Sequence, residues 1–188
     1  LREVSLGNDG NYDDESVTRR INADLANDLG NLIQRSCSMV VKNCNNVIPI
    51  FWENKDSDDL LIDTEITNWS DKIINYLEFI EINKILNDIW EQISALNKYF
   101  SDQKPWELRK TNPERMNTVL YITIENIRKI AIMLQPVMPD SSKNILNLLD
   151  IDINKRTFKD ITNKDSAIKN NRIGNLSPIF PKIETSDE

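Results

Sequence analysis

The sequence predicts an all-α protein: an antiparallel bundle of about five helices, with a short extended N-terminal segment and an irregular C-terminal tail. Two observations lead to this prediction. Apolar residues recur at steps of three and four over long stretches, which is the pattern of a helix with one buried face. The seven prolines fall outside these stretches or at their edges, where a helix begins or ends.

The chain divides into three parts on this basis: residues 1–15, a bundle over 16–150 and a tail over 151–188. The first part is rich in Gly, Asn and Asp, which form turns. The first helix is expected from Val17 to Lys42, with Ser16 as its N-cap and acidic residues just before it. The tail is polar and weakly periodic, so we expect it to lie on the bundle.

The middle of the chain is expected to hold two helices. Residues 45–63 are polar and are predicted to form a connection that includes an acidic run. The helical pattern resumes at Thr64 and lasts to about Asp102, which is long for one globular helix. We therefore predict a break near Tyr76–Glu81.

A fourth helix has clear start and stop signals. Asn112 is a good N-cap and Pro113 suits the first helical position, while Pro136 lies just past the expected end. A fifth, short helix is predicted from Pro139 to about Leu149.

Composition excludes several classes of active site. The chain has 188 residues, of which 39% are hydrophobic and 28% charged, and a net charge of −7. This acidity argues against non-specific nucleic-acid binding, which depends on neutralising phosphates. There is no histidine, so the chain contains neither a histidine-dependent nucleophile nor a histidine metal site. Four glycines cannot form a glycine-rich phosphate loop, and no apolar run approaches the ~20 residues of a membrane span.

The two cysteines, Cys37 and Cys44, are seven residues apart in the first predicted helix. Two helical turns separate their Cα atoms by about 10 Å, too far for a disulfide. We expect reduced thiols and a cytoplasmic protein. The chain begins without methionine or a signal peptide and looks like a piece of a longer one.

A polar stripe runs along the first helix. Asn27, Asn31 and Arg35 follow one another at steps of four, which places them along one strip of an α-helix. Asn and Arg side chains form paired hydrogen bonds with base edges. The alternative is an ordinary solvated face. Gly30 beside the stripe indicates close approach by a neighbouring helix or a ligand.

The second feature is a basic, aromatic segment between the third and fourth helices, with the sequence KPWELRK at residues 104–110. Trp106 follows Pro105, which restricts the local backbone, so the indole is a candidate platform for an unpaired base. The alternative is a tryptophan packed over a turn. A local positive patch steers RNA even on an acidic chain, and the candidate phosphate contacts are Lys104, Arg109, Lys110 and Arg115.

The remaining aromatic and acidic candidates are expected to be structural. Trp52, Trp69 and Trp90 are interpreted as packing residues. The acidic run Asp56–Asp59 lacks the glycine and distant glutamate of a calcium loop, so no metal site is predicted.

Several segments together carry a resemblance to a known family. In chain order they are RINADLANDLGNLIQRS, ALNKYFSDQKPWELRK, LQPVMPDSS and the closing SPIFPKIE. This set resembles methionyl-tRNA synthetases, class I enzymes, in their C-terminal anticodon-binding domain. Residues 1–15 resemble the end of the connection from the stem-contact fold.

The resemblance implies that this bundle reads the CAU anticodon of methionine tRNA. The residues matching Asn31 and Arg35 contact the first anticodon base, the one matching Trp106 stacks on it, and Pro105 matches the supporting proline. Asn27 matches a further polar position one turn earlier.

The resemblance also implies what lies elsewhere. The parent enzyme, a methionine-tRNA ligase, uses ATP and Mg, but the HIGH and KMSKS signatures of its catalytic domain are missing here. We therefore expect an inactive fragment without its own cofactor, whose partners are methionine tRNA and the missing catalytic domain. A monomer without membrane contact is the simplest expectation.

Two alternatives remain at this point. One is an acidic helical module that docks a partner protein, which would fit the net charge of −7. The other is the equivalent bundle of a synthetase for another amino acid.

Overall fold

The structure is a computed structural model, and it describes residues 13–50, 56–78 and 81–184. The segment 1–12 and Trp52 lie outside the described residues, as do the details of the Trp69 side chain. The described elements are α1 (Asp14–Arg20), a π-helical segment (Ile21–Gly30), α2 (Asn31–Asn43), α3 (Ser57–Glu78), α4 (Ile82–Gln103), α5 (Pro105–Thr111), α6 (Pro113–Leu134) and α7 (Pro139–Leu148). The prediction of an all-α bundle is confirmed.

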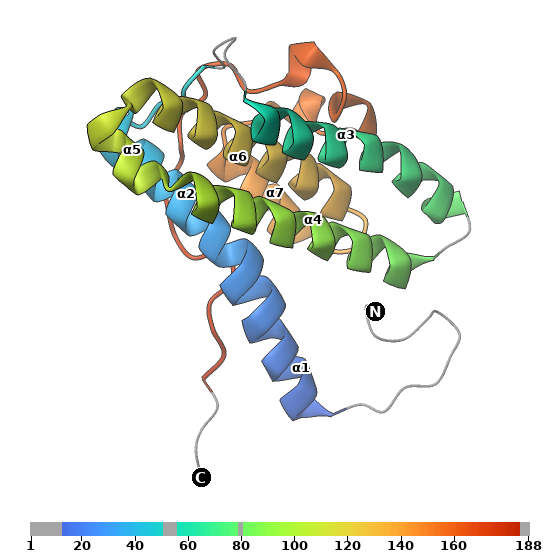
Figure 1. Cartoon of the computed structure of the whole chain (residues 1–188). Coiled ribbons are helices and arrows are strands. Elements are labelled where there is room, and N and C mark those ends of the chain that lie inside the picture. Colours follow the sequence, from blue (N-terminus) through green and yellow to red (C-terminus); the bar gives the residue numbers. More distant parts are fainter. Residues whose placement is uncertain (1–12, 51–55, 79–80, 185–188) are drawn as a thin grey trace.

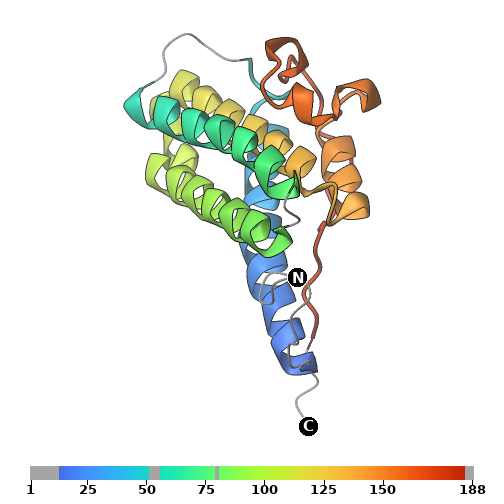
Figure 2. The ribbon, with the colours of Figure 1, turned by 90° about the vertical axis from the view of Figure 1, so that its right-hand side faces the viewer.

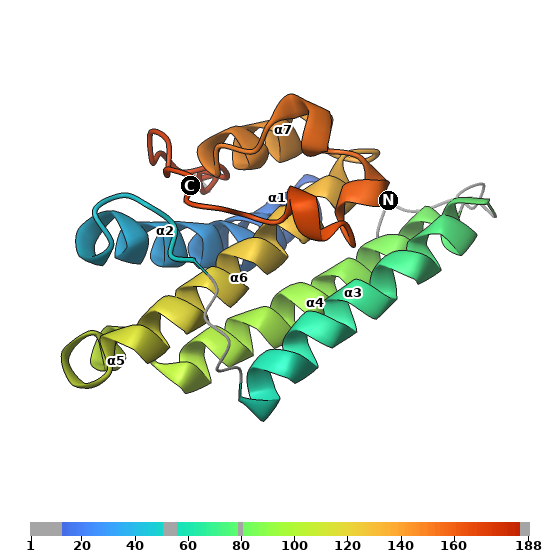
Figure 3. The same ribbon diagram turned by 90° about the horizontal axis from the view of Figure 1, so that it is seen from above.

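The central element is α6, which contacts α2, α3, α4, α5 and α7. Figure 3 shows α3 and α4 side by side, with α6 between this pair and α7. Because α6 is surrounded, almost all of its residues from Met116 onward are buried, and they include the polar residues Glu125, Asn126 and Arg128. The helices thus form layers around one core.

The first helix is longer and less regular than predicted. It begins at Asp14 instead of Val17, because the N-cap is Asp13 and not Ser16. The Asp13 carboxylate accepts a hydrogen bond of 2.9 Å from the backbone N–H of Ser16. α1, the π-helical segment and α2 follow one another without a gap and form one rod (Figure 1). The predicted end near Lys42 is confirmed by the end of α2 at Asn43.

The third helix corrects a second boundary. α3 begins at Ser57, seven residues before the predicted start at Thr64. The cause is a reciprocal cap: the Asp59 N–H donates to Asp56 Oδ1 at 3.0 Å, and the Asp56 N–H donates to Asp59 Oδ2 at 3.1 Å. The acidic run interpreted as a connection is therefore the first turn of a helix.

The other helix boundaries agree closely with the prediction. α3 ends at Glu78 and α4 begins at Ile82, so the predicted break is confirmed. Asn112 caps α6 by accepting the Arg115 N–H at 3.1 Å. One element was missed: the segment 105–111, predicted as a connection, forms the short helix α5 with Pro105 at its first position.

The C-terminal segment lies against the bundle through short 3₁₀ turns and buried isoleucines, among them Ile161, Ile168 and Ile173. Arg128 of α6 is fully buried, is paired with Glu125 and donates to the carbonyl oxygen of Asp160 at 3.1 Å. The last described residues run beside α1 and the π-helical segment (Figure 2). There Asn22 and Ile183 exchange hydrogen bonds of 2.9 and 2.8 Å.

Candidate functional site

The candidate site is built around Trp106 on α5. Lys104 adopts a left-handed conformation with φ 45°, which turns the chain sharply between α4 and α5. Pro105 then starts α5 and is buried, whereas Trp106 is 39% exposed. The indole packs against Phe100 at the end of α4, with ring centroids 6.2 Å apart and planes at 59°. Phe100 therefore supports one side of the indole, and part of the indole remains open to solvent.

Arg35 reaches the same place from α2. Its guanidinium carbon lies 5.4 Å from the Trp106 ring centroid and 5.1 Å from that of Phe100. Both distances are within the range of cation–π attraction. Two candidates that are 71 positions apart in the sequence thus meet in the fold.

A shallow depression of about 440 Å³ accompanies this contact. Its lining combines α2, the end of α4 and α5, and consists of Gln34, Arg35, Ser38, Met39, Phe100 and Trp106. Sequence reasoning did not select Gln34, Ser38, Met39 or Phe100 for the site. Phe100 follows the apolar periodicity of the predicted third helix, but that periodicity gives no sign that the apolar face ends against the indole.

Asn31 and Asn27 are exposed on the same rod as Arg35. Asn31 and Arg35 both belong to α2, so they are one α-helical turn apart on one face, as predicted. Asn27 belongs to the π-helical segment, where the turns are wider, and the α-helical spacing assumed for it does not apply there. Apart from Leu25 of its own helix, the atoms nearest to a Cβ added at Gly30 belong to Phe180 of the C-terminal segment, not to a neighbouring helix.

The four basic candidates separate into two groups. Lys104, Arg109 and Lys110 are exposed on or next to α5. Arg115 is different, because its guanidinium pairs with both Asp59 oxygens and with Asp56 at 2.7 Å, and donates to Gln103 at 2.6 Å. Arg115 is therefore reassigned from phosphate contact to a structural ion pair.

The Arg115 network also shifts the titration of its members. Burial alone would raise the pKa of Asp59, but the hydrogen bonds from Arg115 and Tyr99 lower the pKa below its ordinary value. Burial and the hydrogen bond to Asp59 raise the pKa of Tyr99, so the phenol stays protonated, and its O–H donates a hydrogen bond to Asp59 at 2.5 Å. The network connects α3, α4 and α6 directly beside α5.

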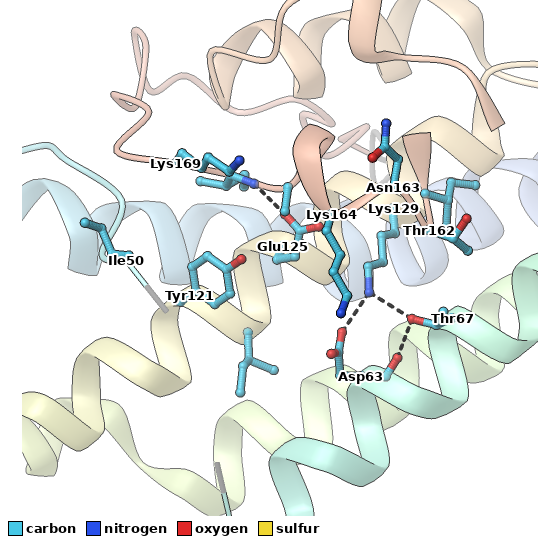
Figure 4. Close-up of a pocket in the computed structure, with 14 residues that line it drawn as sticks. Ile50, Asp63, Thr67, Tyr121, Glu125, Lys129, Thr162, Asn163, Lys164 and Lys169 are labelled. Atoms are coloured by element: carbon cyan, nitrogen blue, oxygen red, sulfur yellow. Dashed lines mark hydrogen bonds and ion pairs between the residues drawn. The ribbon is translucent and has the colours of Figure 1, made fainter. Parts of the chain in front are cut away.

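A larger cavity of about 560 Å³ lies elsewhere, between α3, α6 and the C-terminal segment (Figure 4). Lys129 points into it and donates to Asp63 at 2.7 Å and to Thr67 at 3.0 Å. Burial, reinforced by the nearby carboxylates of Glu125 and Asp63, raises the pKa of Tyr121 on its wall. These contacts join α6 to α3, and none of the predicted site residues lines this cavity.

Other candidate sites are not found in the described part of the chain. Its residues contain no group of three or more His, Cys, Asp or Glu side chains placed to hold a metal ion. None of its helices has the length and apolar character needed to cross a membrane. Cys37 and Cys44 are free thiols, as expected, and Trp90 is buried as a packing residue. The fold and the site thus define an all-α bundle domain that presents an aromatic platform and polar side chains at one end.

Comparison with known proteins identifies this class further. The family model described as the anticodon binding domain of methionyl tRNA ligase matches residues 52–187. The methionine–tRNA ligase of Brucella suis is 38% identical over 188 residues, covering 100% of this chain and 36% of the relative. That of Mycobacterium tuberculosis strain H37Rv is 44% identical over 162 residues, covering 84% of this chain and 31% of the relative.

Solved structures agree with the sequence comparison. The apo form of Mycobacterium tuberculosis methionyl-tRNA synthetase has a TM-score of 0.91 at 37% identity, covering 98% of this chain and 37% of that one. A structure of the same enzyme bound by methionyl-adenylate has a TM-score of 0.89 at 38% identity, covering 96% and 36%. The chain belongs to the methionyl-tRNA ligase family and forms its anticodon-binding domain.

This membership decides between the earlier alternatives. It argues against a bundle from a synthetase for another amino acid and against an unrelated acidic docking module. The chain spans only about a third of the length of these relatives.

Proposed function

We propose that this domain reads the CAU anticodon of methionine tRNA, with the first anticodon base held at the Trp106 site. One observation carries the proposal: the partly exposed indole of Trp106 lies within 5.4 Å of the Arg35 guanidinium, beside an open depression. Sequence-specific RNA recognition targets loop bases that can be unstacked, placed on an aromatic ring and read on their polar edges. An aromatic ring beside a polar donor meets this requirement.

Each site residue then has a distinct task. Trp106 stacks on the base, and Pro105 fixes the start of α5 beneath it. Arg35 offers guanidinium donors to the acceptor atoms of cytosine, and Asn31 offers both a donor and an acceptor. Asn27, one turn earlier, contributes a further polar contact to the loop.

Backbone phosphates are proposed to contact the exposed cations Lys104, Arg109 and Lys110. Such contacts set the register of the RNA but carry no base specificity. The acidic chain as a whole would repel RNA, so a local basic patch also orients the approach of the anticodon stem-loop.

The reaction itself is proposed to take place outside this chain. About two thirds of the length of the relatives lies outside the part that matches this chain. A structure of one relative holds methionyl-adenylate. We propose that the parent enzyme joins methionine to tRNA with ATP and Mg in that missing part, and that it acts as a cytoplasmic monomer.

The test is a titration of the chain into a fluorescently labelled CAU anticodon stem-loop, followed by the fluorescence anisotropy of the label, which reports binding whether or not Trp106 is present. The parallel titration uses a stem-loop altered at the first anticodon base. Loss of a stacking platform is worth about 1–3 kcal/mol, so Trp106→Ala is expected to weaken CAU binding by about five-fold or more. Trp106→Phe keeps an aromatic face and serves as the matched control, with a smaller loss.

The stacking role would be refuted if Trp106→Ala bound the CAU loop with the affinity of the parent chain. The variant must show the far-ultraviolet circular dichroism of the parent chain, so that it is known to be folded. Equal affinity of the parent chain for both stem-loops would refute anticodon reading by this domain.

A further inference from the structure

The π-helical segment Ile21–Gly30 is an unusual feature at a sensitive place. π-helices are rare, mostly single turns, and frequent at functional sites. Here ten residues adopt this form immediately before Asn31, the first residue of α2. Its sequence, INADLANDLG, is rich in Asn, Asp and Gly, which are poor α-helix formers. The local sequence therefore permits the wide turns, but it does not by itself fix them.

Two side chains from α4 hold this segment in place. The indole N–H of Trp90 donates to the carbonyl oxygen of Asp24 at 3.3 Å, and the amide of Asn97 donates to the carbonyl oxygen of Asp28 at 3.2 Å. α4 contacts the π-helical segment along this stretch (Figure 1). Both bonds join residues more than sixty positions apart, so they are tertiary restraints on the helix register.

The Asn97 bond lies directly next to Asn31. The backbone N–H of Asn31 donates to the carbonyl oxygens of Ala26 and Asp28, which are five and three residues earlier. The Asp28 carbonyl oxygen therefore accepts two donors at once: the Asn97 amide and the Asn31 N–H. The Asn97 side chain and the main chain of Asn31, the proposed base-reading residue, are thus linked through a single atom, the Asp28 carbonyl oxygen.

We infer that Asn97 is a positioning residue for base reading: its amide holds the Asp28 carbonyl, which fixes where α2 starts and hence where Asn31 and Arg35 point. A second bond, to the carbonyl oxygen of Ile93 in its own helix at 3.2 Å, orients the amide for this role. Without Asn97, the junction has one restraint fewer on its wide turn, and a regular α-helical register would rotate the residues on either side of it relative to each other. This inference rests on the proposed function.

The test measures discrimination and not affinity alone. The readout is the ratio of the dissociation constants for stem-loops with an altered and with the natural first anticodon base. Asn97→Asp keeps the shape but removes both amide donors, and Asn97→Leu does so without adding charge. Each is expected to lower the ratio about three- to ten-fold, which is the effect of losing one neutral hydrogen bond that orients a reading residue.

Trp90→Phe is the matched control, because it also removes a hydrogen bond from a side chain of α4 to a carbonyl oxygen of the π-helical segment. The acceptor in this case is Asp24, seven residues before Asn31. It is expected to lower thermal stability but to leave the discrimination ratio within about two-fold of the parent chain. As a spectroscopic signature, the amide ¹H–¹⁵N resonance of Asn31 is expected to shift in both Asn97 variants and to stay in place in the control.

The outcomes separate the two proposals. A parent chain that discriminates between the loops, with unchanged discrimination in both folded Asn97 variants, overturns the positioning role alone. Equal losses of discrimination in the Asn97 variants and in Trp90→Phe overturn it as well, because general loosening would then explain them. A parent chain without discrimination overturns the proposed function, and this inference with it.

Discussion

Asp59 is predicted to be the charged residue on which the stability of the Trp106 end of the bundle depends most. Its side chain is 0% exposed and accepts hydrogen bonds from Tyr99 and from both terminal nitrogens of Arg115. Arg115 in turn donates to Gln103, so the residues before and after α5 are joined by the guanidinium that this carboxylate binds. Asp59→Asn keeps the volume and removes the charge.

The expected cost follows from the partners that remain. Removing one member of a buried ion pair costs about 3–5 kcal/mol when the other charge is left alone. Arg115 keeps Asp56 at 2.7 Å and Gln103 at 2.6 Å, so the lower end, about 3 kcal/mol, is expected for Asp59→Asn. For a domain of this size that lowers the melting temperature by about 6–12 °C.

The pH dependence has a definite sign. The pKa of Asp59 is lowered in the folded state, so folding favours the ionised form. This contribution is complete above the pKa of the unfolded chain, near 3.8, and is lost as the pH falls through the lower pKa of the folded state. The parent chain is therefore expected to lose stability in that acid range more steeply than Asp59→Asn.

The assays are thermal unfolding and urea unfolding, each followed by tryptophan fluorescence, at neutral pH and at steps below pH 5. Asp58→Asn is the matched control: Asp58 is the exposed neighbour and accepts one bond, from Gln103 at 3.2 Å, so its loss should cost about 0.5 kcal/mol or less. A melting temperature of Asp59→Asn within about 2 °C of the parent chain, or equal losses in both variants, would refute the reasoning.

Two further predictions concern packing and thiol chemistry. Gly30→Ala should destabilise the fold by about 1–2 kcal/mol in urea unfolding, since the added Cβ would lie 2.9 Å from a backbone carbonyl oxygen and 3.6 Å from the Phe180 ring. Gly174→Ala, whose nearest contacts are 3.6 Å, should be close to neutral, and equal losses would contradict this explanation. With a thiol reagent near pH 8, Cys44 should react first, because burial raises the pKa of buried Cys37 to about 12. Mass spectrometry that finds Cys37 labelled first in the folded chain would be the contrary result.

The helices could be predicted wherever local signals were sufficient. Periodicity and capping residues gave α4, α6 and α7 nearly to the residue. The start of α3 was missed because an Asp-Ser-Asp-Asp run is typical of a solvated turn. Its helical state depends on a reciprocal cap, and the burial of Asp59 depends on Arg115, a partner 56 positions later in the chain.

In the candidate site, too, some residues could be selected from local signals, whereas others depend on contacts that only the fold creates. Trp106 and Arg35 could be selected from residue chemistry and from the family resemblance, and the fold brings them together. Phe100 could not be selected, because an apolar residue on an apolar face carries no distinguishing signal. Asn97 could not be selected either, since its bond to a main-chain carbonyl depends on a π-helical register that α-helical spacing does not predict.

The cations near Trp106 show why proximity in sequence is a poor guide to function. Arg115 lies five residues after Lys110 and has the same charge, yet α6 turns it toward the N-terminus of α3, where Asp59 and Asp56 bind it. Lys110, on the last turn of α5, remains exposed. A charge that already neutralises a buried carboxylate cannot also neutralise a phosphate without leaving that carboxylate unpaired. Arg115 therefore holds the scaffold of the Trp106 site, and under the proposed function the phosphate contacts are assigned to its exposed neighbours.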